Sequence, residues 1–125
     1  MAFVLFNPNP EKNLVGDCVV RAIAKLTNQD WETTYIDICM QGFKMYDMPS
    51  SNEVWATYLY EKGYNMRIIP NMCPDCYTIR KFCLDNPKGK FLVATGSHVV
   101  AIDNGDYYDT WDSGDEIVTY FFEGE

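Results

Sequence analysis

The 125-residue sequence has no long hydrophobic run, few basic residues and a single histidine. No apolar stretch approaches the roughly 20 residues that a membrane-spanning helix needs, so we expect no membrane partner. The N-terminal segment MAFVLFNPNP lacks the basic residues and the long apolar stretch of a signal peptide, which favours a cytoplasmic protein. Ten Lys and Arg against eighteen Asp and Glu give a net charge of −8, and so acidic a surface repels phosphate backbones. We therefore expect no nucleic-acid partner.

The sequence contains five cysteines, an odd number that cannot pair completely within one chain. Without a secretion signal, free thiols in a reducing compartment are favoured. Cys73 and Cys76 form a Cys-x-x-Cys motif, which is typical of zinc sites and redox pairs. Zinc would need two more ligands, of which Cys83 could be one, and a redox pair would need the motif to open a helix. We favour ordinary loop thiols, with no metal and no cofactor.

The pattern of apolar residues predicts one α+β domain over residues 1–125. A short strand is expected at 3–6, and a second one is expected at 64–69. Helices are expected at 17–26, 31–40, 50–63 and 78–86. From residue 90 the apolar period changes from 3.6 to 2, which predicts a meander of four strands at 90–95, 98–103, 106–111 and 116–122. The sequence therefore predicts N-terminal helices packed on a C-terminal antiparallel sheet.

Cys18 lies in the first turn of the most apolar predicted helix. The unpaired N–H groups and the dipole at this end of a helix favour an anion, so they lower the pKa of a thiol. Asp17 is expected to be the N-cap, and Arg21 and Lys25 are expected to form the solvent-exposed edge of the helix. A cysteine followed by two valines is more often a small core residue, so Cys18 needs a partner elsewhere before chemistry can be assigned to it.

His98 opens an apolar strand and is the candidate partner. Asn104-Gly105 predicts a two-residue type I′ turn after that strand. Such a turn pairs Asp103 with Asp106. Because directly opposed and alternate residues share a face, Asp109 then lies on the same face as His98, one diagonal step away. We expect the Asp109 carboxylate to accept a hydrogen bond from the imidazole and to hold it in the tautomer that a base needs.

Three segments, in this order, resemble the papain-like cysteine peptidases. Those enzymes carry a cysteine at the start of an N-terminal helix, a histidine that opens a strand, and Asn-Ser-Trp at the end of the next strand. Here the segments read GDCVVRAIA (16–24), GSHVVAID (96–103) and DTW (109–111). Asp at the third position is typical of the branch that resembles bacteriocin-processing peptidases. The order matches over most of the chain, whereas residues 40–90 match only in their expected secondary structure.

The resemblance implies a papain-like fold and a cysteine-dependent hydrolase. Cys18 would be the nucleophile, His98 its base and Asp109 the residue that orients the imidazole. The thiolate would attack an amide, isopeptide or thioester in a peptide or protein substrate, without a metal or an organic cofactor. One alternative stays open, a catalytically silent papain-like scaffold that acts as a protein-binding or inhibitor module.

The expected oxyanion donor departs from the family's pattern. These enzymes usually have a Gln about six residues before the cysteine, where this sequence has Lys12. The amide of the neighbouring Asn13 could donate to the oxyanion together with the backbone N–H of Cys18, or Asn13 could be an ordinary turn residue. Trp55 and Trp111 could line a substrate cleft, although most aromatic residues are expected to pack in the core.

Overall fold

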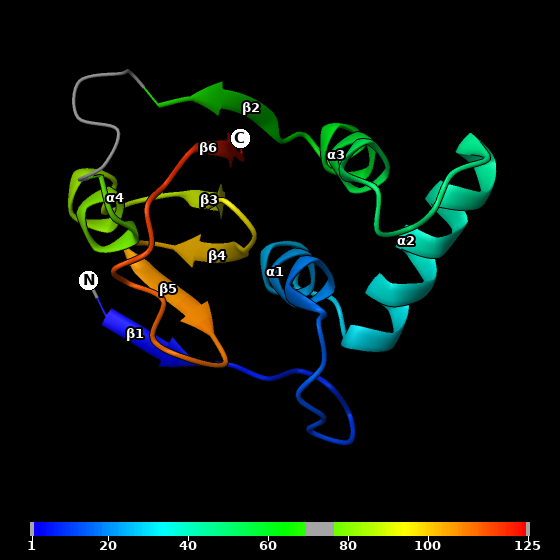
Figure 1. Cartoon of the computed structure of the whole chain (residues 1–125), viewed down its shortest axis with the longest axis horizontal. Helices are drawn as coiled ribbons and strands as arrows, with labels where there is room; N and C mark the ends of the chain where they lie inside the picture. The colour runs from blue at the N-terminus through cyan, green and yellow to red at the C-terminus, as the bar shows by residue number, and fades with distance from the viewer. Residues whose placement is uncertain (1, 70–76, 125) are drawn as a thin grey trace.

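In the computed structural model, which describes residues 2–69 and 77–124, four helices pack on a six-stranded sheet (Figure 1). The helices are α1 (Cys18–Thr27), α2 (Trp31–Met45), α3 (Asn52–Glu61) and α4 (Ile79–Asp85). The strands are β1 (Ala2–Leu5), β2 (Asn65–Ile68), β3 (Lys90–Ala94), β4 (Val99–Asp103), β5 (Asp106–Asp109) and β6 (Tyr120–Glu123). These elements confirm the predicted α+β class. Within the described ranges, no helix is both long and apolar enough to cross a membrane.

The sheet is mixed and has the strand order β1-β5-β4-β3-β6-β2, so the expected antiparallel sheet is wrong. β1 pairs in parallel with β5, whereas every other neighbouring pair is antiparallel. The expected meander holds only through β3, β4 and β5, because β6 returns to the free edge of β3. There Phe122 lies opposite Leu92, and both side chains are buried. Burial of these side chains in one core, rather than the order of the strands in the chain, decides the pairing.

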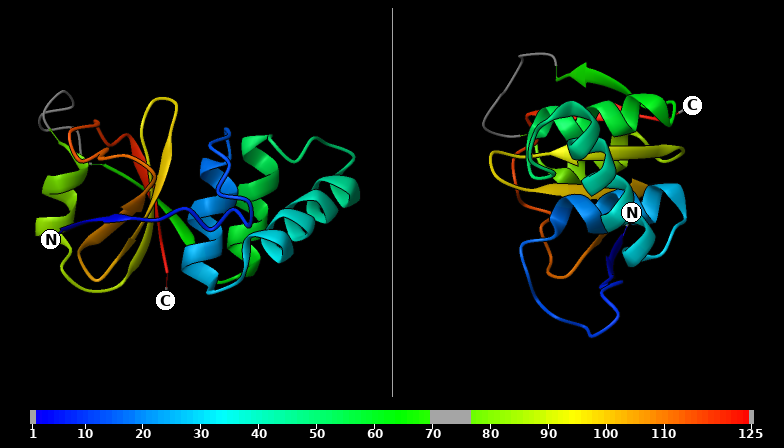
Figure 2. Two further views of the ribbon diagram at one scale, coloured as in Figure 1. Left: turned by 90° about the horizontal axis from the view of Figure 1, so that it is seen from below. Right: turned by 90° about the vertical axis from the view of Figure 1, so that its right-hand side faces the viewer.

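Helices cover both faces of the sheet (Figure 2). α1 and α3 lie on one face with α2 outside them, and α4 lies on the opposite face. Along β3 the side chains alternate between two cores. Leu92 and Ala94 join the core beneath α1 and α3, whereas Phe91 and Val93 join the core beneath α4. The central strands are therefore apolar on both faces, which is why they read as nearly continuous hydrophobic runs.

α1 and the β4–β5 hairpin are the elements that position the candidate site. Ile23 of α1 is fully buried against the sheet. The hairpin turns at Asn104 and Gly105, whose φ angles of 51° and 82° are those of a left-handed turn. Asp103 pairs with Asp106, as the turn predicted. The hairpin therefore fixes which residues of β5 lie beside the start of β4.

The end of α2 differs from the expected one. The helix continues past residue 40 to Met45, because the left-handed residue that closes it is Tyr46, with a φ of 55°. The backbone N–H of Tyr46 bonds back to the carbonyls of Gly42 and Phe43. At the other end, the Asp30 side chain accepts a hydrogen bond from the backbone of Thr33, as a helix N-cap does. The Cys73 and Cys76 motif lies outside the described residues.

Candidate active site

Helix α1 brings the thiol of Cys18 to the start of strand β4. Cys18 is the first residue of α1 and is half-buried. Its thiol lies beside the imidazole of His98 and the backbone of Val99, and the three residues line one cavity. Two residues that are 80 positions apart in the sequence therefore meet where the helix packs on the sheet.

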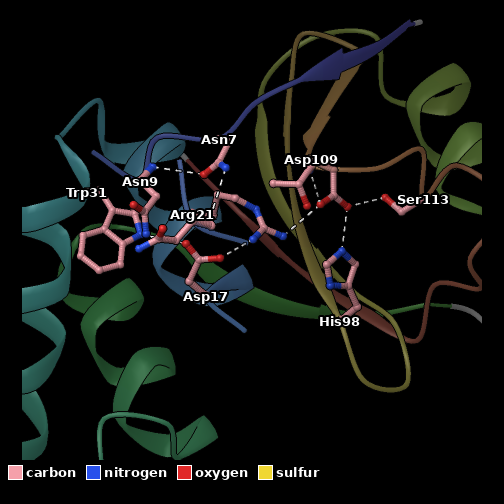
Figure 3. A network of polar contacts seen from close by, with 10 residues as sticks. Asn7, Asn9, Asp17, Arg21, Trp31, His98, Asp109 and Ser113 are labelled. Atoms are coloured by element: carbon pink, nitrogen blue, oxygen red, sulfur yellow. Dashed lines mark hydrogen bonds and ion pairs between the residues drawn. The ribbon is translucent and has the colours of Figure 1, made fainter. Parts of the chain in front are cut away.

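The other side of the imidazole is bonded to Asp109 (Figure 3). Nε2 of His98 lies 2.7 Å from Oδ2 of Asp109, the last residue of β5. Because Nε2 is used by the carboxylate, Nδ1 is the nitrogen that remains for Cys18. Asp109 is only 1% exposed, and Ser113 Oγ donates to the same Oδ2 at 2.6 Å. The structure thus joins the three residues that the sequence singled out as a thiol, a base and an orienting carboxylate.

Arg21 contradicts the expectation of a solvent-exposed edge on α1. Its side chain is buried, with 6% of the residue exposed, and it bridges two carboxylates. One is Asp17, the N-cap residue of α1, and the other is Asp109, whose Oδ1 lies 3.0 Å from Nη2 of Arg21. Asp17 also accepts a hydrogen bond from Nε1 of Trp31 at 2.8 Å. The Asp17 carboxylate is used in this way and makes no side-chain cap for the helix, although its position is the predicted one.

The surroundings shift the pKa values of the three candidate residues in complementary directions. Burial would raise the pKa of the Cys18 thiol, but the hydrogen bonds from His98 and Val99 and the positive charges of His98 and Arg21 outweigh it and lower that pKa. Burial would lower the pKa of His98, but the hydrogen bonds and the negative charges of Asp109 and Cys18 raise it to about 9. At neutral pH these shifts favour a thiolate beside an imidazolium.

The pKa of Asp109 is lowered, although burial alone would raise it. Hydrogen bonds from His98 and Ser113, the charge of His98 and the backbone N–H of Thr110 hold the carboxylate in its ionised form. Cys83 is the opposite case, because burial raises its pKa to about 11. Of these two thiols, only Cys18 has surroundings that activate it.

A cavity of about 150 Å³ lies beside Cys18 and His98. Trp55 of α3 lines it, as does the 95–97 segment that precedes His98. Asn52, at the start of α3, also lines it and accepts a hydrogen bond on Oδ1 from Nε1 of Trp55 at 3.0 Å. The cavity leaves open space next to the thiol, with Trp55 as one wall.

Trp111 and Asn13 do not line this cavity. Trp111 is 47% exposed and is not among the residues that line this cavity; its ring lies against His98, with centroids 5.2 Å apart and planes at 32°. Asn13 is exposed in the segment before α1, and its carbonyl accepts from Nδ2 of Asn7 at 3.4 Å. Its role as an oxyanion donor stays a prediction, as does a cleft role for either tryptophan.

Sequence reasoning missed Arg21 and Ser113. Arg21 stands three residues after Cys18 and four after Asp17, a spacing that places it beside both on one side of a helix. That spacing was the available signal. For Ser113 we see no local signal, because its contact with Asp109 depends on the path of the chain after β5. Within residues 2–69 and 77–124, no cluster of three or more His, Cys, Asp or Glu side chains could hold a metal ion.

Comparisons of the chain with protein-family models, curated proteins and solved structures find no match. The chemistry of the site is therefore inferred from its own residues and their contacts.

Proposed function

We propose that the protein is a papain-like cysteine hydrolase that cleaves an amide, isopeptide or thioester in a peptide or protein. The observation that carries this proposal is that Cys18 lies beside the imidazole of His98, which is hydrogen-bonded to the buried Asp109. A thiol, an imidazole and a buried carboxylate in this order form the arrangement that activates a cysteine nucleophile. The position of Cys18 in the first turn of α1 supports the same role.

The proposed reaction is acyl transfer in two steps. The Cys18 thiolate attacks the carbonyl carbon, and the leaving group departs with the proton that the His98 imidazolium carries. A thioester between the acyl group and Cys18 remains. His98 then takes a proton from a water molecule, whose oxygen attacks the thioester, and Cys18 leaves as a thiolate. Asp109 keeps Nδ1 of His98 directed at the sulfur throughout, through its bond to Nε2.

The oxyanion that forms during each attack needs donors close to the sulfur. The backbone N–H of Cys18 is one candidate, because the first N–H groups of a helix have no partner within the helix. The amide of Asn13 is the second donor in this proposal. Trp111, which lies against the imidazole, shields the His98–Asp109 bond from water.

The first test is the labelling of Cys18 by iodoacetamide at pH 6, resolved by mass spectrometry of the peptides. We expect fast labelling in the wild type and at least about a tenfold slower rate in His98→Ala, because the thiolate fraction falls about tenfold for each unit by which the thiol pKa rises. Cys83 in the same molecule is the internal control, since its raised pKa should leave it unlabelled at this pH. Equal labelling of Cys18 in both proteins would contradict the proposal.

Two aspartates provide a matched pair of variants. Asp109→Asn should slow the labelling of Cys18, whereas Asp112→Asn should not, because Asp112 bonds to Tyr107 and Arg80 instead of His98. Turnover is then followed with p-nitrophenyl acetate, looking for acetylated Cys18 and for continued release of p-nitrophenol. Labelling at pH 6 without any turnover would favour the silent binding scaffold over the hydrolase.

A further inference from the structure

A buried arginine completes the surroundings of the candidate triad. Arg21 lies between Asp17 and Asp109, and the contacts run without a break from Trp31 of α2 to His98, just before β4 (Figure 3). We propose that Arg21 is a positioning residue, which fixes the Asp109 carboxylate in the rotation that faces Nε2 of His98. This inference rests on the proposed function, in which Asp109 orients the base.

Four donors surround the carboxylate of Asp109 and fill its acceptor sites. Oδ2 takes the bonds from His98 and Ser113, at 2.7 and 2.6 Å. Oδ1 takes the bonds from Arg21, at 3.0 Å, and from the backbone N–H of Thr110, at 2.8 Å. Without Arg21, the backbone N–H of Thr110, the residue after Asp109, is the remaining donor to Oδ1. Rotation of the carboxylate away from His98 then breaks one hydrogen bond fewer.

The arginine itself is held from two sides. Nη1 bonds to Asp17 and Nη2 bonds to Asp109, so the two ends of one planar guanidinium reach two carboxylates in fixed directions. Trp31 holds the far oxygen of Asp17 from α2. A lysine at this position would supply the same charge as a compact point without the planar fork. An Arg21→Lys variant therefore keeps the charge of the guanidinium and removes its shape.

Charges alternate along the contacts that involve Arg21. Asp17, Arg21, Asp109, His98 and Cys18 follow one another, and in the ionised state each group faces the opposite charge. The next ion pair on α1 and β4 joins Lys25 to Asp103 at 3.6 Å. Removal of the positive charge of Arg21 would raise the pKa of His98, whereas loss of the aligned Asp109 carboxylate would lower it. The two roles of Arg21 thus predict opposite shifts.

The test is the titration of His98, the only histidine, by NMR of its Cε1–H signal in Arg21→Lys and Arg21→Gln. If Arg21 positions Asp109, the midpoint of His98 falls by about one pH unit in Arg21→Lys, because the charge is kept and the alignment is lost. In Arg21→Gln the loss of charge opposes the loss of alignment, so we expect the midpoint to lie above that of Arg21→Lys. An unchanged or higher midpoint in Arg21→Lys would overturn the proposal. Should Arg21→Gln fail to fold, Arg21→Lys decides alone.

Arg80 supplies the matched control. It bonds to Tyr107 and Asp112 near the same loop, and no hydrogen bond or ion pair among the described residues joins it to His98 or Asp109. Arg80→Lys should leave the midpoint of His98 unchanged. The same titrations in a Cys18→Ala background separate this inference from the proposed function. In that background, a lower midpoint of His98 in Arg21→Lys supports the positioning role even if Cys18 proves to have no hydrolase activity. An unchanged midpoint overturns the positioning role.

Discussion

His98 combines two features that make the site measurable. It is the only histidine of the chain, and its imidazole is bonded to Asp109 and lies beside Cys18. In the wild type we expect its NMR titration to have a midpoint at about pH 9, well above the usual 6.5. Burial opposes this rise, so the shift depends on the two partners and reports on them directly.

Substitution of the partners should lower that midpoint. Asp109→Asn removes a negative charge and a strong acceptor, and we expect the midpoint to fall by about one unit or more. Asp112→Asn, on the same loop, should leave it unchanged, because Asp112 bonds to Tyr107 and Arg80. A wild-type midpoint near 6.5 would mean that His98 is not paired with Asp109 in solution.

The three candidate residues could be predicted from the sequence because each one stands in a local pattern. A helix start identified Cys18, a strand start identified His98, and the register of a hairpin identified Asp109. Arg21 could not be predicted in the same way. Its polar side chain on an amphipathic helix reads as solvent-exposed, and only the arrival of Asp109 from a distant strand makes burial of that charge favourable.

At the scale of elements, the β4–β5 hairpin carries both His98's strand and Asp109. Gly105 has a φ of 82°, and a Cβ there would lie 3.4 Å from Cα of Pro87. We expect Gly105→Ala to lower the free energy of unfolding by about 1–2 kcal/mol, because a side chain disfavours the left-handed conformation. Urea denaturation followed by circular dichroism measures this loss.

A second glycine is the control for this variant. A Cβ added at Gly16 would meet no heavy atom of the described residues within 4 Å, and the φ of Gly16 is not positive. Gly16→Ala should therefore change the free energy of unfolding by less than about 0.5 kcal/mol. If both variants lose the same stability, backbone strain at the turn is not the cause.

The partners of the strands were harder to predict than the strands themselves. The apolar strand patterns and the Asn104-Gly105 turn correctly indicated β3, β4, β5 and the two pairings between them. The parallel pairing of β1 with β5 and the return of β6 to β3 join segments that are far apart in the sequence. Local patterns contain no information on such pairs, which are decided by the burial of side chains such as Phe122 beneath the helices.

At the scale of the molecule, the candidate site lies where the helical layer meets the sheet. α1 supplies Cys18 and Arg21, and the sheet supplies His98 and Asp109, so the polar contacts of the site also hold the two layers together. The ionisation of these groups is consequently linked to folding. A group whose pKa differs between the folded and the unfolded chain makes the stability depend on pH.

The contribution of His98 to this linkage can be measured in Cys18→Ala. In the wild type, the lowered pKa of the Cys18 thiol changes the stability in the opposite direction over the same pH range. Asp109 still raises the pKa of His98 in the folded variant. The stabilisation from His98 is then fully present below the unfolded pKa of about 6.5 and is lost as the pH rises through the folded pKa. We expect the free energy of unfolding to fall above pH 6.5 by at most about 1.4 kcal/mol per pH unit. Urea denaturation between pH 6 and 9 should show this fall in Cys18→Ala and not in Cys18→Ala/His98→Gln; parallel profiles would mean that the His98–Asp109 bond contributes nothing to folding.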